Sequence, residues 1–436
     1  MSAEVDHGKR MFDFARQLWS YPRSLTGQGV RQTLNDISNR LPGLQILEVP
    51  SGSKVGDWTV PQEWIVQSAR LTGPDGKTIC DYEDNNLHLI GYSDSYRGLL
   101  SLEELQPYLY SLPDLPTAIP YVTSYYERRW GFCISHEMRQ SLKPGQYNVD
   151  IKTRYVDGSL HYGELVLPGE TDDEIFVSTY ICHPSLANNE LSGPVVATEL
   201  ADVISSRQSR RYTYRFVFAP ETIGAIAYLA TNATHLKSKV KAAFNLTCVG
   251  DERSYSLLPT RQGKRGIDTV ARHVLRHHAP SYVEYPWTER GSDERQYGSP
   301  PVDLPMISMM RTKYWQYPEY HSSLDQLGTV VTADGLLGGL DVHLTAIEIL
   351  EENMIPLTST IGEPMLGKRG LYSTLGAGNF SIGPTFLLDV WSLCDGQTST
   401  LEIAERLGVS FRQTNSAIDT LVKHELVSLC GHKVCE

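Results

Sequence analysis

The residues best suited to chemistry lie in polar clusters that follow apolar runs. His183 comes shortly after the apolar run 174–180 and precedes Asn189 and Glu190. Imidazole nitrogen and carboxylate oxygen on a rigid scaffold are ligands that zinc accepts. The segment also fits a helix-capping loop, in which Asn188 or Asn189 caps the next helix and His183 makes a structural hydrogen bond.

Two further clusters contain a glutamate and a histidine. Glu221 follows the apolar run 214–219, and an apolar environment raises a carboxyl pKa toward the range of a general base. The alternative is a first-turn glutamate that stabilises a helix dipole. His321 lies in a polar turn, and Asp325 four residues later could orient its ring. Surface histidines in loops are the alternative interpretation.

A fourth cluster covers residues 289–297 and includes Asp293, Glu294, Arg295 and Gln296. Carboxylates there could bind a substrate ammonium group, and the arginine could bind a carboxylate. A solvated run of charges is the alternative.

The order of elements predicts the fold class. Strands are predicted at 174–180, 214–219, 241–246 and 306–310, and helices at 192–204, 224–232, 267–277 and 333–353. Alternation of strands and helices is typical of an α/β fold with a mainly parallel sheet and helices on both faces. Ligands of such sheets bind at the carboxyl ends of the strands, where the clusters lie.

Three other stretches differ from this α/β region in composition and periodicity. Residues 8–48 have helical periodicity, and residues 50–160 read as an irregular β-rich module with short runs such as 64–66 and 87–90. Residues 382–436 show a helix–turn–helix pattern. This tail has four Lys/Arg and seven Asp/Glu residues. Because DNA-binding domains of this type are basic, we expect the tail to pack on the protein or to contact another protein, and not to bind DNA.

Composition excludes several classes of protein. The chain of 436 residues has a formal net charge of −12, which argues against nucleic acid as a partner. No apolar run is long enough to span a membrane, and the N-terminus lacks a signal-peptide pattern, so we expect a cytoplasmic protein. The seven cysteines form no C-x-x-C pair and are expected to be buried free thiols.

Taken together, these segments resemble the DUF4910 family of aminopeptidase-like proteins, relatives of the M28 zinc aminopeptidases. The resemblance covers almost the whole chain. It implies a three-layer zinc-aminopeptidase-like core (1–48 and 160–365), an inserted β-rich DUF2172 domain (49–159) and a C-terminal winged helix (376–436). The motifs that carry it lie at 57–64, 119–126, 130–133, 182–185, 220–224, 247–251, 292–297 and 320–325.

The resemblance also implies site residues. His183 and His321 match metal ligands, and Glu221 matches the general base. Thr222 stands where two-metal relatives have a second glutamate ligand, which points to one zinc ion per chain. Tyr320 is expected to donate a hydrogen bond to the developing oxyanion.

One departure affects the metal site. The family loop usually reads Ala-Asn-Asp-Asn-Leu-Ser-Gly with the aspartate as ligand, but this chain has Asn189 followed by Glu190. Either Glu190 reaches the metal, or zinc binds weakly through Asn189, or the metal is lost. An amide brings no negative charge, and a residue moved by one along a helix points about 100° away.

The expected function is zinc-dependent cleavage of an amide next to a free amino group, in a small peptide or aminoacyl conjugate of a biosynthetic pathway. Asp251, Asp293 or Glu294 would hold the ammonium group, with Arg295 and Gln296 as further substrate contacts. A homo-oligomer is compatible with the sequence. The alternative is a metal-depleted, catalytically inactive protein that binds such a ligand.

Overall fold

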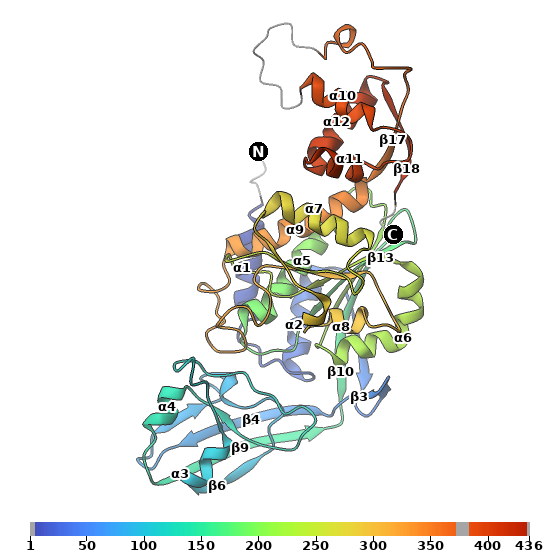
Figure 1. Ribbon diagram of the computed structural model, residues 1–436. Coiled ribbons are helices and arrows are strands. Elements are labelled where there is room, and N and C mark those ends of the chain that lie inside the picture. Colours follow the sequence, from blue (N-terminus) through green and yellow to red (C-terminus); the bar gives the residue numbers. More distant parts are fainter. Residues whose placement is uncertain (1–4, 372–382, 434–436) are drawn as a thin grey trace. The chain divides into compact units, whose positions relative to one another are not determined.

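The structure is a computed structural model that describes residues 5–371 and 383–433 (Figure 1). The chain divides into two compact units. The first unit comprises Met1–Arg261 and Val283–Asp341, and the second comprises Gln262–Tyr282 and Val342–Glu436.

An eight-stranded sheet forms the centre of the first unit. The strand order is β1-β10-β12-β11-β13-β16-β14-β15. The central strands β12, β11, β13 and β16 are parallel, whereas β1, β10 and β14 pair antiparallel. This confirms the predicted α/β fold with a mainly parallel sheet. The bounds are β1 Gln45–Pro50, β10 Ser159–Leu167, β11 Glu174–Tyr180, β12 Thr213–Ala219, β13 Val240–Leu246, β14 Ser256–Leu258, β15 Val283–Glu284 and β16 Met306–Met310.

Helices cover both faces of this sheet, and β11 is accordingly buried along its whole length. Successive side chains of a strand point to opposite faces. Phe176 of β11 stacks with Tyr228 of α6 (Ile223–Lys239), whereas Thr179 faces the start of α5 (Ser192–Ser205). A Cβ at Gly193 would lie 2.4 Å from Thr179 Oγ1 and from the Leu246 carbonyl oxygen, so only glycine lets α5 start this close to the strand ends.

The N-terminal stretch forms two helices, α1 (His7–Leu18) and α2 (Gln28–Arg40), as predicted. The prediction of helical structure up to residue 48 was wrong at its end. Residues 45–50 form the edge strand β1 instead, because they pair with β10 in an antiparallel register. Helix α6 also runs to Lys239, beyond its predicted end at 232.

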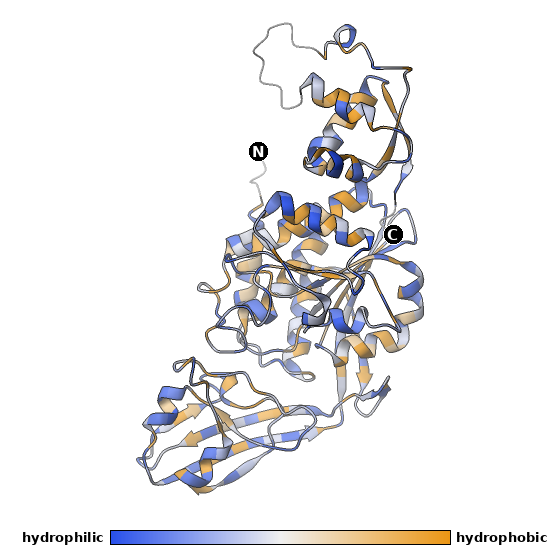
Figure 2. Cartoon of the chain, in the orientation of Figure 1, coloured by the Kyte–Doolittle hydropathy of each residue, from blue (hydrophilic) through white to orange (hydrophobic). Residues whose placement is uncertain are grey.

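The β-rich module contains a four-stranded antiparallel sheet with the order β5-β4-β9-β6. Figure 2 shows hydrophobic and hydrophilic residues alternating along its strands. The run 87–90, one of the short runs that indicated a β-rich module, begins with a 3-10 turn over Asn86–His88. Its elements are β2 Lys54–Val55, β3 Trp58–Thr59, β4 Glu63–Thr72, β5 Thr78–Asp81, η1 Asn86–His88, β6 Tyr96–Ser101, α3 Leu102–Leu105, η2 Gln106–Tyr108, β7 Leu109–Tyr110, β8 Phe132–Cys133, α4 His136–Ser141 and β9 Gln146–Val156.

The second unit contains the predicted helix–turn–helix. Ile403 and Ala404 of one helix and Ala417, Ile418 and Leu421 of the next are buried. The elements wholly within this unit are α7 Gly266–His278, β17 Met354–Thr358, η5 Gly367–Arg369, α10 Pro384–Ser392, α11 Thr400–Leu407, α12 Phe411–Lys423 and β18 Val427–His432. Helix α9 (Ala333–Glu352) begins in the first unit and ends in the second. The first residues of the predicted winged-helix domain, 376–382, lie outside the described residues.

A buried histidine connects three helices of the second unit. His273 Nδ1 lies 2.5 Å from Glu405 Oε1, and its Nε2 accepts a hydrogen bond from the Phe411 backbone N–H at 2.9 Å. That second bond requires the neutral ring. Burial lowers the pKa of His273, although Glu405 opposes this shift, and the nearby His277 and Arg276 support it.

We therefore expect the stability of this unit to decrease at low pH. Below about pH 6.5 the unfolded chain protonates this histidine before the folded chain does, so the free energy of unfolding falls as the pH falls, by at most about 1.4 kcal/mol per pH unit for one proton. Hydrogen exchange of the α11 and α12 amides at pH 7 and pH 5 measures this. His273→Gln should flatten the pH dependence, and an unchanged profile in that variant would rule out His273 as its source.

The thiols agree with the prediction only in part. Five of the free cysteines are buried: Cys80, Cys133, Cys182, Cys248 and Cys394. Cys430 is exposed, because it lies on β18, which forms a sheet of only two strands with β17. Cys435 lies outside the described residues. No helix in the described ranges has the length and hydropathy needed to cross a membrane.

Candidate active site

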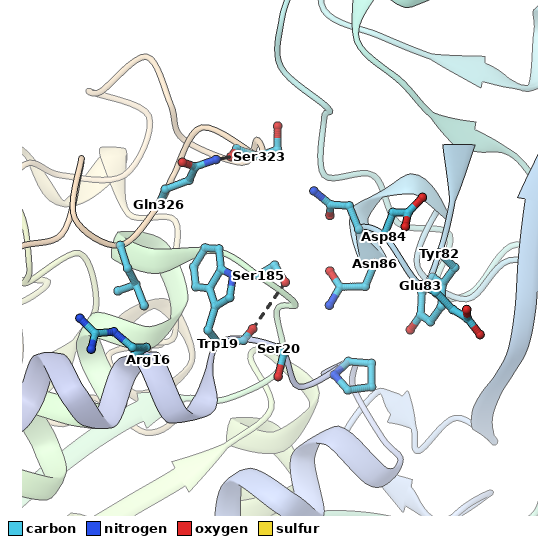
Figure 3. Close-up of a pocket in the computed structure, with 13 residues that line it drawn as sticks. Arg16, Trp19, Ser20, Tyr82, Glu83, Asp84, Asn86, Ser185, Ser323 and Gln326 are labelled. Atoms are coloured by element: carbon cyan, nitrogen blue, oxygen red, sulfur yellow. Dashed lines mark hydrogen bonds between the residues drawn. The ribbon is translucent and has the colours of Figure 1, made fainter. Parts of the chain in front are cut away.

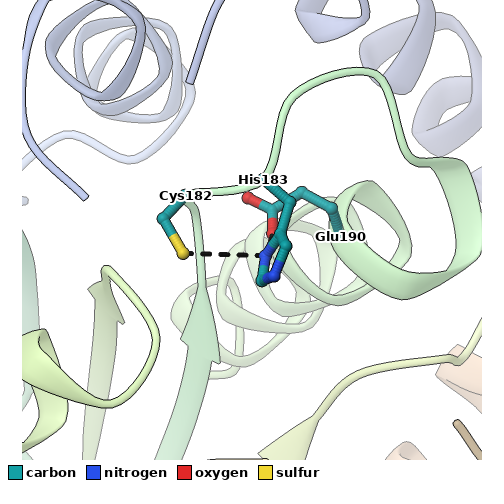
Figure 4. Close-up of side chains that lie close together, drawn as sticks. All are labelled: Cys182, His183 and Glu190. Atoms are coloured by element: carbon teal, nitrogen blue, oxygen red, sulfur yellow. Dashed lines mark hydrogen bonds and ion pairs between the residues drawn. The ribbon is translucent and has the colours of Figure 1, made fainter. Parts of the chain in front are cut away.

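His183 is buried in the loop after β11, with its two ring nitrogens in different surroundings. Nδ1 lies 2.8 Å from Glu190 Oε2 and 3.6 Å from Cys182 Sγ (Figure 4). Nε2 lies 3.6 Å from Glu221 Oε2. Burial lowers the pKa of His183 to about 3, so the ring is neutral near pH 7. A neutral imidazole has a free lone pair on one nitrogen.

Glu190 is held on the Nδ1 side of His183 by a single turn of π-helix, η3 (Ala187–Leu191). Its side chain is fully buried, and Oε1 lies 3.6 Å from the guanidinium of Arg23, which is also fully buried. Arg23 donates to the carbonyl oxygens of His183 and Leu18 at 2.9 and 2.7 Å. Burial raises the pKa of Glu190, and Arg23 opposes that shift. Glu190 therefore orients the imidazole through Nδ1, as carboxylates do for metal-bound histidines.

Neither Asn188 nor Asn189 caps α5 with its side chain. The Asn188 side chain donates to Asp251 and accepts from the Gly250 N–H, and Asn189 Nδ2 donates to the Tyr180 hydroxyl at 2.7 Å. The capping interpretation was wrong, because helix α5 continues directly from the π-helix turn and has no side-chain cap.

Asp325 does not orient His321, so that prediction was also wrong. Its two carboxylate oxygens accept the backbone N–H groups of Asn188 and Asn189 at 2.8 and 3.0 Å. Tyr317 donates a third hydrogen bond to it at 3.2 Å. Asp325 thus fixes the loop that follows His183, and the link between the two histidine segments runs through this carboxylate.

His321 lies next to His183, and Tyr121 contacts both rings. The ring centroids of the two histidines are 5.6 Å apart, and Tyr121 makes edge contacts with both at 4.9 and 5.2 Å. Tyr320 stacks on His321 with centroids 3.9 Å apart. Burial lowers the pKa of His321 to about 3. Two imidazoles bound to one ion at about 2.0–2.1 Å have ring centres roughly 5 Å apart, so the spacing suits a shared metal.

Glu221 lies beside His183 on a strained turn before α6. Thr222 has φ 63°, which is an outlier for a β-branched residue. Its N–H donates to Asp293 at 2.7 Å, and its hydroxyl accepts from Arg295 at 2.7 Å. Glu221 precedes the helix, so it is not a first-turn glutamate. Burial raises the pKa of Glu221, and the neighbouring Asp293 raises it further.

The cluster at 289–297 is not a solvated run, because Asp293 and Glu294 are buried. Burial raises the pKa of Asp293 to about 7, and its Oδ2 has no hydrogen-bond partner among the described residues. Arg295 Nη2 lies 4.0 Å from Glu221 Oε1. Asp293 and Arg295 therefore belong to the site together with Glu221.

Other predicted substrate contacts have internal partners. Glu294 accepts from Gly291, Ser292, Asn245 and the Tyr314 hydroxyl. Asp251 accepts from Asn188, Arg253 and both polar groups of Thr312. Both carboxylates are thus occupied in fixing loops. Gln296 is partly buried next to Arg295, with no contact to the histidines.

A cavity of about 260 Å³ opens beside Glu221. We call it the aromatic cavity, since Trp58, Tyr125 and Tyr126 of the β-rich module form one wall. Cys182, Glu221, Thr222 and Arg295 line the other side, with Leu25 and Ile223.

The sequence interpretation missed the roles of Arg23 and Tyr121. Tyr121 lies within one of the motifs that carry the family resemblance, and that signal could have placed it near the site. No signal marked Arg23, because its partner Glu190 is far away in the sequence.

The donor atoms fit one metal ion better than two. Two neutral imidazoles lie together, and Asn189 Oδ1 is buried with no hydrogen-bond partner among the described residues, so it is a further donor atom from this loop. Glu221 lies beside His183 as the candidate base. A second ion lacks a carboxylate ligand, since residue 189 is an asparagine and residue 222 is a threonine whose hydroxyl accepts from Arg295. The grouping of Cys182, His183 and Glu190 is less suitable for a cation, because the Arg23 guanidinium lies next to Glu190.

The fold defined by this sheet is that of the aminopeptidases. The chain is similar to a zinc aminopeptidase from Bacillus subtilis, with a TM-score of 0.56, 14% identity, and 78% of this chain and 94% of that chain covered. It is also similar to an M28 peptidase precursor from Shewanella amazonensis, with a TM-score of 0.56, 12% identity, and 78% and 92% covered. At such identities the likeness concerns the fold alone.

The chain belongs to the DUF4910 family, a domain of unknown function, which matches residues 12–353, and a winged helix-turn-helix family matches residues 354–429. A Clostridium acetobutylicum relative is named a polysaccharide biosynthesis protein with an aminopeptidase-like domain. It is 39% identical over 427 residues, which cover 97% of this chain and 96% of the relative. A crystal structure of a peptidase from that organism has a TM-score of 0.89 and 38% identity, with 97% and 96% covered.

Proposed function

We propose that this chain is a single-zinc aminopeptidase-type amidohydrolase. The observation that carries the proposal is the convergence of His183 and His321, with ring centroids 5.6 Å apart, next to the Glu221 carboxylate. His183 and Glu221 follow the ends of β11 and β12, and His321 lies in the loop between β16 and α9. Two neutral imidazoles, one buried and one partly buried, that meet beside a carboxylate and a cavity are typical of a hydrolytic metal site.

His183 and His321 would hold the ion, and zinc supplies Lewis-acid activation of a carbonyl when bound. Glu190 keeps the His183 ring in place through Nδ1. Glu221 takes a proton from the attacking water and returns it to the leaving amine. Asp293 is the buried carboxyl available for the substrate's ammonium group, and Tyr320 lies against His321, where its hydroxyl can donate to an oxyanion.

The substrate class follows from the size of the site. Trp58, Tyr125 and Tyr126 of the β-rich module close one side of the aromatic cavity, which limits it to a small acyl group. The name of the Clostridium relative refers to polysaccharide biosynthesis. We therefore infer a biosynthetic, cytoplasmic enzyme that cleaves a small aminoacyl conjugate.

Zinc binding tests the metal site directly. We expect about one equivalent of zinc per chain after dialysis against zinc and then buffer, and close to none in His183→Ala or His321→Ala, because each variant removes one of the neutral nitrogen ligands. Metal analysis by mass spectrometry measures this. His136→Ala, in the β-rich module, is the matched control and should keep its zinc.

A metal-free binding protein is the second candidate. It is favoured by one observation: residue 189 is an asparagine and Glu190 lies at Nδ1, so the loop supplies no carboxylate to the Nε2 side of His183. If the wild-type chain retains no zinc in the same experiment, this candidate replaces the hydrolase.

A further inference from the structure

A groove of about 750 Å³ is lined by residues of the two segments that carry the histidines (Figure 3). We call it the polar groove. One wall is the end of α1 and the turn after it, with Arg16, Trp19 and Ser20. Ser185, Ser323 and Gln326 follow His183 and His321 in sequence and line the same groove. The opposite wall is the segment Tyr82–Asn86 of the β-rich module.

The side chains of the polar groove suit a ligand rich in hydroxyl groups. Amides (Asn85, Asn86, Gln326) and carboxylates (Glu83, Asp84) accept hydrogen bonds, and the amides also donate them. Trp19 offers an aromatic surface that can cover the C–H face of a sugar ring. Such mixtures of planar polar groups and an aromatic ring match a saccharide.

The charge of the groove disfavours phosphorylated sugars. Glu83 and Asp84 face one cation, Arg16, among the lining residues. An anionic ligand such as a nucleoside diphosphate sugar would meet net negative charge there, whereas a neutral or amino sugar would not.

Asn86 is an independent sign of a ligand. Its Oδ1 is buried and has no hydrogen-bond partner among the described residues. Figure 3 shows its amide extending from the β-rich module toward Ser185 and Ser20 on the other wall. A buried acceptor left without a partner is costly, and a bound hydroxyl or ammonium group can satisfy it.

We propose that the polar groove binds an amino sugar, which is the amine half of the substrate; this rests on the proposed function. Ser185 and Ser323 place the groove within two residues of each histidine, and the aromatic cavity opens at Glu221. In this proposal the substrate is an N-aminoacyl amino sugar, with its sugar in the polar groove and its acyl group in the aromatic cavity. Hydrolysis breaks the amide C–N bond; the hydroxyl of water goes to the acyl carbon and the hydrogen to the nitrogen, which releases an amino acid and a free amino sugar.

Ligand binding tests the groove without any need for catalysis. Saturation-transfer NMR of the full chain with D-glucosamine should give ring-proton signals, and Trp19→Ala should reduce them at least about fivefold because the aromatic surface is gone. Asn86→Ala provides a second variant if Trp19→Ala fails to fold. Trp58→Ala removes the same side chain from the aromatic cavity and should leave the sugar signals unchanged. No transfer to glucosamine, or equal transfer in wild type and both groove variants, would overturn the proposal.

Turnover separates this proposal from the proposed function. N-alanyl-glucosamine should be cleaved with a kcat/KM at least about tenfold above that of alanine isopropylamide, and Trp19→Ala should remove most of that preference through KM. Cleavage of both substrates at equal rates would reject the sugar site and keep the hydrolase. Sugar binding without cleavage of either would reject the hydrolase and keep the sugar site.

Discussion

Replacement of Glu221 by glutamine is expected to lower the kcat of amide hydrolysis by about a thousandfold, within the range that general acid–base groups contribute. The glutamine side chain has nearly the same shape but cannot take up a proton at neutral pH. Glu221 Oε2 lies 3.6 Å from His183 Nε2, beyond hydrogen-bond distance, so the ring keeps its place through Glu190 when Glu221 is changed. KM should therefore change little.

The Glu221→Gln experiment measures zinc content together with turnover. Retained zinc with lost turnover is the expected result for a proton carrier. Loss of zinc along with turnover would make Glu221 a metal ligand, and unchanged turnover would remove it from the reaction. Glu319→Gln serves as the control, since Glu319 pairs with Arg253 near the surface and should leave both quantities unchanged.

Local patterns predicted the elements of the core well, because continuous apolar runs such as 174–180 leave little choice but a buried strand. The same runs predicted the site in outline. His183 and Glu221 lie shortly after parallel strands, and such strands bring their carboxyl ends to one edge of the sheet, where the long loop after β16 places His321.

The partners of these residues could not be predicted, because hydrogen bonds between distant segments leave no local trace. Asp325 was assigned to His321 by its spacing of four residues, yet its carboxylate binds the backbone of Asn188 and Asn189. Glu190 was considered as a ligand, yet the π-helix turn points it to the far nitrogen of His183. A turn of that kind shifts each side chain around the helix axis, so helical spacing alone gave the wrong direction.

Removal of Arg23 is expected to be the most destabilising change at the site. Arg23→Met should lower the free energy of unfolding by about 3–5 kcal/mol, the range found when one partner of a buried pair is removed. Two causes add up: Glu190 loses its nearest guanidinium, and the carbonyl oxygens of His183 and Leu18 lose their donor. Urea denaturation measures the change. Arg253→Met, which breaks the partly exposed pair with Glu319, should cost no more than about 1 kcal/mol.

The double variant Arg23→Met/Glu190→Gln separates these two causes. The amide introduced by Glu190→Gln carries no charge, so the Arg23→Met change should cost less in this background, and the difference is the coupling free energy of the pair. A glutamine oxygen can still accept a hydrogen bond from the His183 Nδ1–H, so the ring should keep its orientation. Zinc affinity should fall by no more than about 10–100-fold, the loss typical when a residue that supports a metal ligand is changed. If the two single changes were simply additive, the Arg23–Glu190 pair would not stabilise the loop, and the position of His183 would depend on the carbonyl contacts of Arg23 alone.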